Sequence, residues 1–120
     1  MAASAETSGI GVTTTPLTDS LVETGVWAGL PVAKGATTSR VVVNNAAMRV
    51  VEFVMDADQE LTDHQSPLAV TLLVGAGELQ VRLDDVAHEL AAGDEVYLAP
   101  RQRHAVLART PARFTLVMVP

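Results

Sequence analysis

Histidine is the residue type that offers the most chemistry in this chain, which has three histidines and no cysteine. His104 begins the apolar run HAVLA, and His64 lies shortly before the apolar run LAVTLLV. Imidazole exchanges protons near neutral pH, and its neutral form binds zinc, iron, manganese, nickel or copper. Without cysteine, disulfides, thiolate metal sites and cysteine nucleophiles are excluded. The fold must therefore position imidazole side chains for proton transfer or for metal binding.

From residue 39 onward, β-branched and apolar runs alternate with breaks made of proline, glycine, asparagine and aspartate, which favour turns. Alternation is clearest in LQVRL, where Leu79, Val81 and Leu83 share one face. No convincing long amphipathic helix appears. The expected strands lie in RVVVNN, MRVVEFVMD, QELTD, LAVTLLV, ELQVRL, VAHEL, EVYLA, HAVLAR and RFTLVMV. About nine short strands with closely spaced turns predict an all-β sandwich or barrel.

Composition divides the chain into three parts. Residues 1–16 are rich in Ala, Ser, Thr and Gly, and we expect them to form a flexible N-terminal tail. Residues 17–38 contain the only tryptophan, Trp27, which we expect to anchor this segment on the barrel or on a partner subunit. Residues 39–120 carry the expected strands and form the predicted barrel domain.

The composition also bears on partners and location. The formal net charge is −6 and there is no basic run, which argues against nucleic acid because phosphates attract clustered Lys and Arg. No apolar run approaches the roughly 20 residues that cross a bilayer. The first residues also lack the pattern of a secretory signal, so we expect a cytoplasmic protein without a membrane partner.

One expected strand is apolar on both faces. The run VTLLV has no polar face that would tolerate water, so it must be covered on both sides. We expect a homodimer to supply the second cover, which would also hide an exposed strand edge. The alternative is that the N-terminal segment covers this strand within one chain.

The segment GDEVYLAPRQRH, from Gly93 to His104, combines a Gly-Asp turn, a short apolar strand, a proline and a histidine where the next strand begins. Together with the strand order and the turn positions, it resembles the second motif of the cupin superfamily, over about residues 39–119. The usual proline of that motif lies one place later here, at Pro100, and its usual inner glycine is Arg101. The resemblance implies a single antiparallel cupin-like β-barrel of jelly-roll type, with His104 pointing into it.

Many cupins hold one divalent metal ion with three histidines and a glutamate, most of which belong to the first motif. Here the corresponding segment, TDHQSPLAVTLLVGAGEL, keeps His64. A second histidine is replaced by Ser66 or, in another register, by Thr62, and no glutamate follows in either register. The resemblance therefore implies one divalent transition metal held by His64 and His104, with a ligand set short of the usual three or four.

Other polar residues are weaker candidates for that ligand set. His64 shares strand parity with Thr62 and Ser66, so Asp63 and Gln65 would face a metal only if a bulge turned one of them inward. The Glu52 side chain would have to reach the metal ion from a neighbouring strand. We expect His88 to be structural or exposed, because it lies near a hairpin end.

A metal-free alternative uses the same barrel. Some cupins, the deoxysugar epimerases, pair a catalytic histidine with a tyrosine or a carboxylate. By that resemblance the candidate catalytic residues are His104 and Tyr97, provided that Tyr97, and not its neighbours Val96 and Leu98, faces the cavity. Arg103 is a candidate ligand-binding residue, as an anion clamp at the barrel mouth, and the alternative is that it is exposed to solvent.

Three functions remain open at this point. The first is binding of a small organic molecule in a mostly apolar cavity lined by Val, Leu and Met, with a polar spot at His64 and His104. The second is a metal-dependent oxygenase or lyase that acts on a small organic acid. The third is a metal-free isomerase or cyclase that uses His104 as acid or base. The sequence does not decide whether the protein is an enzyme.

Overall fold

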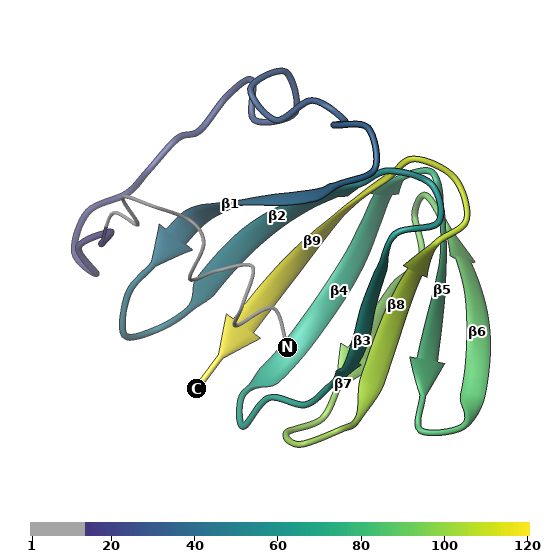
Figure 1. Cartoon of the computed structure of the whole chain (residues 1–120). Coiled ribbons are helices and arrows are strands. Elements are labelled where there is room, and N and C mark those ends of the chain that lie inside the picture. The colour runs from purple at the N-terminus through teal and green to yellow at the C-terminus, as the bar shows by residue number, and fades with distance from the viewer. Residues whose placement is uncertain (1–13) are drawn as a thin grey trace.

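The computed structural model describes residues 14–120 and consists of β-strands joined by turns (Figure 1). The strands are β1 (Thr37–Asn44), β2 (Arg49–Met55), β3 (Glu60–His64), β4 (Ala69–Ala76), β5 (Glu78–Leu83), β6 (Val86–Ala91), β7 (Glu95–Leu98), β8 (His104–Ala108) and β9 (Ala112–Val119). Each of the nine segments expected to be β-rich forms a strand, and the described residues contain no helix. The all-β prediction is therefore confirmed.

The strands form two antiparallel sheets. The five-stranded sheet has the order β1-β2-β9-β4-β7, and the four-stranded sheet has the order β3-β8-β5-β6. In Figure 1, β1 and β2 lie at one end of the molecule, and β5 and β6 lie at the other. Between residues 14 and 120 no strand pair joins the two sheets, so the jelly roll that we expected takes the form of a sandwich of two sheets.

The core lies between the two sheets because side chains alternate along each strand. In β9 the inward residues are Ala112, Phe114, Leu116 and Met118, all of them buried. The rings of Phe53 and Phe114, which are direct partners on β2 and β9, stack with centroids 5.0 Å apart. The interior that we expected to be lined by Val, Leu and Met therefore also contains two stacked phenylalanines.

The strand that is apolar on both faces is β4. Val70, Leu72 and Val74 are buried on its inner side, while Thr71 and Leu73 are half-buried on its outer side. That a second copy of the chain covers this outer face stays a prediction.

Trp27 fixes the N-terminal segment to the outer face of the five-stranded sheet. Its ring lies against Gly75, where there is no room for a Cβ, and the guanidinium carbon of Arg113 lies 5.3 Å from the ring centroid. The same guanidinium donates hydrogen bonds to the carbonyls of Trp27 (3.2 Å) and Leu30 (2.8 Å). The segment is thus held by cation–π contact and by hydrogen bonds to its own backbone.

Most of the predicted flexible tail, residues 1–13, lies outside the described residues. The part that is described is bound to the sheet, because the Thr15 amide donates to the carbonyl of Asn44 at the end of β1 (2.9 Å). Within residues 14–120 there is no helical segment of the length and hydropathy that crossing a bilayer requires.

The turn between β4 and β5, which carries the chain from one sheet to the other, depends on Gly77. Its φ is +77°, and a Cβ there would overlap the carbonyl oxygen of Pro111. We expect Gly77→Ala to lower the free energy of unfolding by about 2–3 kcal/mol, measured by urea denaturation. The matched control is Gly35→Ala, because Gly35 has a similar φ of +65° but nothing within 4 Å of a Cβ. It should cost only about 1 kcal/mol, and equal losses would contradict this account of Gly77.

Candidate functional site

His64 and His104 face each other across two neighbouring strands. β3 and β8 pair antiparallel, and the register aligns Leu61 with Val106 and His64 with His104. Two residue steps on β8 thus match three steps on β3, which means that β3 contains a bulge. Directly opposed residues of an antiparallel pair share a face, so Leu61 and His64 lie on the interior side with their buried partners Val106 and His104.

Because of the bulge, the strand parity that we predicted for His64 is wrong. Simple alternation places Thr62 and Ser66 on its face, but Thr62 and Asp63 are both exposed and together form the bulged part of the strand. Asp63 has a φ of +28°, a backbone conformation that aspartate tolerates better than most residues. A bulge was considered as a way to turn Asp63 inward, but the bulge turns it outward and His64 inward.

His104 is buried, with 2% of its surface exposed, on the same face as Val106 and Ala108. Its Nδ1 lies 2.8 Å from the carbonyl oxygen of Gln102, which can only accept a hydrogen bond. Nδ1 must therefore carry the proton, and Nε2 is the acceptor atom of the ring. Burial lowers the pKa of His104 below its usual 6.5, while the bond to Gln102 acts in the opposite direction.

His64 is half-buried at the end of β3, so solvent reaches it more easily than His104. Burial lowers the pKa of His64 below 6.5, the nearby His104 adds to this shift, and Asp63 opposes it. Both imidazoles are therefore neutral at neutral pH, which suits hydrogen bonding, proton abstraction or metal binding.

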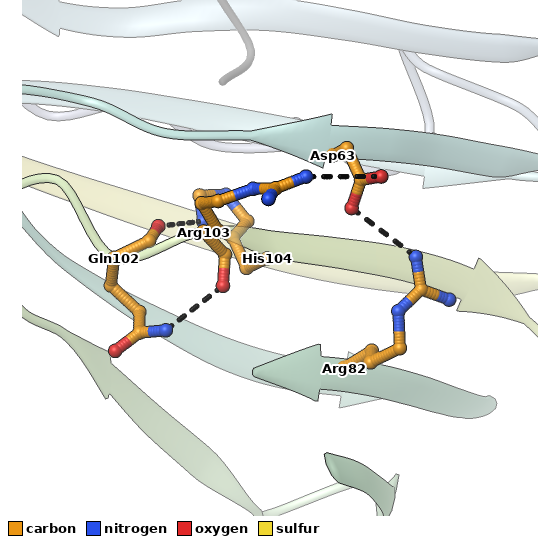
Figure 2. A network of polar contacts seen from close by, with 5 residues as sticks. All are labelled: Asp63, Arg82, Gln102, Arg103 and His104. Atoms are coloured by element: carbon orange, nitrogen blue, oxygen red, sulfur yellow. Dashed lines mark hydrogen bonds and ion pairs between the residues drawn. The ribbon is translucent and has the colours of Figure 1, made fainter. Parts of the chain in front are cut away.

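Asp63 pairs with two arginines on the outer face of the four-stranded sheet. Its Oδ1 lies 3.3 Å from Nη2 of Arg82, and its Oδ2 lies 3.6 Å from Nη2 of Arg103 (Figure 2). The Arg103 side chain is 63% exposed, whereas His104 is only 2% exposed. The structure therefore joins Arg103 to Asp63 and does not bring it to the two imidazoles.

The loop that leads into β8 connects the two sequence motifs. Arg101 has a φ of +67°, and its amide donates a 2.6 Å hydrogen bond to the carbonyl of Ser66. A glycine takes this left-handed conformation without strain, which explains why the second cupin motif usually has a glycine at this position. The Ser66 hydroxyl accepts a hydrogen bond from the amide of Leu68 (3.1 Å), so its role is to close the turn before β4.

The remaining candidates lie elsewhere in the fold. Tyr97 is 64% exposed on the outer face of the five-stranded sheet, while its neighbours Val96 and Leu98 point inward, so it does not share a site with His104. Glu52 lies on the outer face of β2, where it accepts a 2.7 Å hydrogen bond from the hydroxyl of Thr115. His88 is exposed on β6, as expected.

These positions decide how well the site suits a metal ion. Among residues 14–120 no group of three or more His, Cys, Asp or Glu side chains is placed to hold one. His64 and His104 supply two ligands, whereas a tight site takes three or four. Asp63 and Glu52, the carboxylates considered as further ligands, both point away from the imidazoles. The described residues therefore do not fit a resident metal with a complete set of protein ligands.

No protein-family model matches the chain, and no curated protein matches it. Solved structures do. A cupin superfamily protein from Desulfitobacterium hafniense matches with a TM-score of 0.73 and 12% identity, over 77% of this chain and 84% of that chain. An uncharacterised conserved protein with a double-stranded β-helix domain from Klebsiella pneumoniae matches with a TM-score of 0.67 and 26% identity, over 73% and 80%. The DMSP lyase DddQ from Ruegeria pomeroyi matches with a TM-score of 0.66 and 16% identity, over 70% of this chain and 47% of that chain.

The lowered histidine pKa values make the stability of the fold depend on pH. Between the folded and unfolded pKa values of these imidazoles, the unfolded chain binds more protons than the folded one. Their contribution is thus fully present above pH 6.5, the unfolded value, and is lost as the pH falls through the folded values. We expect the free energy of unfolding to decrease between about pH 7.5 and pH 5.5. Urea denaturation at a series of pH values measures this.

Two variants test whether the pH dependence of the free energy of unfolding comes from the buried histidine pair. His104→Gln should flatten the pH profile, whereas His88→Gln, which changes an exposed histidine, should leave it as steep as in the unchanged protein. The carboxylates of Asp56 and Glu89 do not interfere in this window, because their pKa values are lowered from 3.8 and 4.5. A flat profile in the unchanged protein would contradict the burial of two neutral imidazoles.

Proposed function

Because the chain has the fold of the cupin superfamily, we propose that it binds a small organic molecule through the imidazoles of His64 and His104, without a resident metal ion. The similarity to solved structures at low identity concerns the fold, and folds of this kind host unrelated functions. The proposal therefore depends on the two side chains and not on the activity of any neighbour.

The observation that carries the proposal is the hydrogen bond between Nδ1 of His104 and the Gln102 carbonyl. It fixes the tautomer of a ring that burial keeps neutral, so that Nε2 is the nitrogen that accepts a hydrogen bond, and His64 opposite is neutral at the same pH. Two neutral imidazoles favour a ligand that donates hydrogen bonds, such as a hydroxyl or an enol. Because His64 is only half-buried, such a ligand can approach from solvent at the end of β3.

The same arrangement supports a metal-free isomerase or cyclase as a second function. An unprotonated Nε2 with a lowered pKa is a competent general base near neutral pH, and the Gln102 carbonyl stabilises the imidazolium formed when it takes a proton. Tyr97 is not part of this proposal, because it is exposed on the outer face, whereas His64 is the register partner of His104.

Fragment binding tests the proposal. The probes are glycolate, lactate and phenol, each compared with a counterpart that lacks the hydroxyl: acetate, propionate and toluene. We expect a hydroxyl-bearing fragment to shift the backbone NMR signals of β3 and β8, and its counterpart to shift them less. His104→Gln should weaken that binding by about tenfold, because a hydrogen bond to a buried acceptor is lost. His88→Gln is the control and should bind as the unchanged protein does.

Two results would overturn the proposal. One is that no hydroxyl-bearing fragment shifts these signals, or that the shifts are the same in His104→Gln. The other comes from elemental analysis of protein purified without an affinity tag. A stoichiometric transition metal that is lost in His64→Ala and in His104→Ala would show that the site is a metal centre.

A further inference from the structure

Asp63 directly precedes His64 and belongs to the bulge of β3 that turns the His64 side chain toward the interior. We propose that Asp63 is a positioning residue, which holds the β3 bulge through Arg82 and Arg103 so that His64 faces His104. The inference concerns the geometry of the ligand-free protein, and its consequence for ligand binding rests on the proposed function.

The three charged residues come from three separate segments of the four-stranded sheet. Asp63 belongs to β3, Arg82 to β5, and Arg103 directly precedes β8, which lies between β3 and β5. Each carboxylate oxygen of Asp63 meets a different guanidinium, at 3.3 Å and 3.6 Å (Figure 2). The carboxylate therefore ties the bulged strand to both the strand beyond β8 and the loop that leads into it.

A small residue on β8 makes room for this bridge. Ala105 is the register partner of Arg82 and follows His104, so its methyl group points to the outer face. Although it lies on the outer face, Ala105 is only 3% exposed. The Asp63–Arg82 pair thus passes over β8 at the level of Ala105, directly beside the register pair of His64 and His104.

The alternative register shows why the bridge matters. In a regular strand His64 would point outward, because it is three residues from the inward-facing Leu61. Asp63 would then point inward, into an apolar interior where an ionised carboxylate is costly. The bulge exchanges the two side chains, and the two arginines stabilise the carboxylate in its outward position. The same arrangement keeps the backbone of Asp63 at its φ of +28°.

The bridge is exposed, so its effect should be local. The side chains of Asp63 and Arg103 are 55% and 63% exposed, and ion pairs of this kind add little to overall stability. Loss of the bridge is therefore expected to change where His64 points without unfolding the sandwich. This separates a positioning role from a purely structural one.

Proton NMR of the full chain near neutral pH, without ligand, tests the inference. Rings on directly opposed residues of an antiparallel pair are close enough for a nuclear Overhauser cross-peak between His64 and His104. We expect this cross-peak in the unchanged protein and its loss in Asp63→Asn, since asparagine tolerates the same backbone conformation but has no charge. Replacing both arginines, with Arg82→Gln and Arg103→Gln, should have the same effect.

Two further variants serve as controls. Arg82→Lys combined with Arg103→Lys keeps the positive charges and should retain the cross-peak. Glu89→Gln removes the ion pair between Glu89 and Arg109 (3.1 Å), which lies on the same sheet but away from His64, and should also retain it. The amide spectrum and the midpoint of thermal unfolding show whether each variant is folded.

The outcomes separate this inference from the proposed function. A cross-peak of undiminished intensity in Asp63→Asn and in the glutamine pair would overturn the positioning role, whatever binds to the site. Loss of the cross-peak in the lysine pair or in Glu89→Gln would also overturn it, because the effect would then not depend on the charge of this bridge. A failure of the hydroxyl-bearing fragments to bind would leave the cross-peak in place and would count only against the proposed function.

Discussion

A buried imidazole in an apolar sandwich is tolerated only if it is neutral and hydrogen-bonded. Burial lowers the pKa of His104 and so keeps its ring neutral, and the 2.8 Å contact with the Gln102 carbonyl supplies the hydrogen bond. The rest of the site depends on this contact. It selects the ring nitrogen that carries the proton, and it fixes the ring beside His64. Both pKa values are lowered mainly by burial, so the pair offers hydrogen-bond acceptors where the same residues in water would titrate close to neutrality.

The two-sheet sandwich holds the residues that form the hydrogen bond between His104 and Gln102 in fixed positions. The loop from β7 to β8 crosses from one sheet to the other, and its Arg101 is held in a left-handed conformation by a hydrogen bond to Ser66. The loop can therefore present the Gln102 carbonyl at a fixed distance from the first residue of β8. On the opposite strand, the β3 bulge gives His64 the same inward direction.

Much of the fold could be predicted from the sequence, because alternating apolar residues and turn residues are local signals. They identified the strands and the inward face of His104, Val106 and Ala108. Whether Tyr97 or its neighbours face inward could not be predicted, because alternation defines two faces without saying which is buried. The bulge was not predicted either, since it depends on Asp63 meeting Arg82 and Arg103, residues that are far apart in the sequence.

The tautomer of His104 is the most direct test of the central claim, and long-range proton–nitrogen correlation NMR of nitrogen-labelled protein measures it near neutral pH. The structure predicts a neutral ring with the proton on Nδ1 and none on Nε2. His88, which is exposed, provides an internal reference in the same spectrum. A proton on Nε2 of His104 in place of Nδ1, or a doubly protonated ring at neutral pH, would contradict the claim that burial keeps this ring neutral and that the Gln102 carbonyl fixes its tautomer.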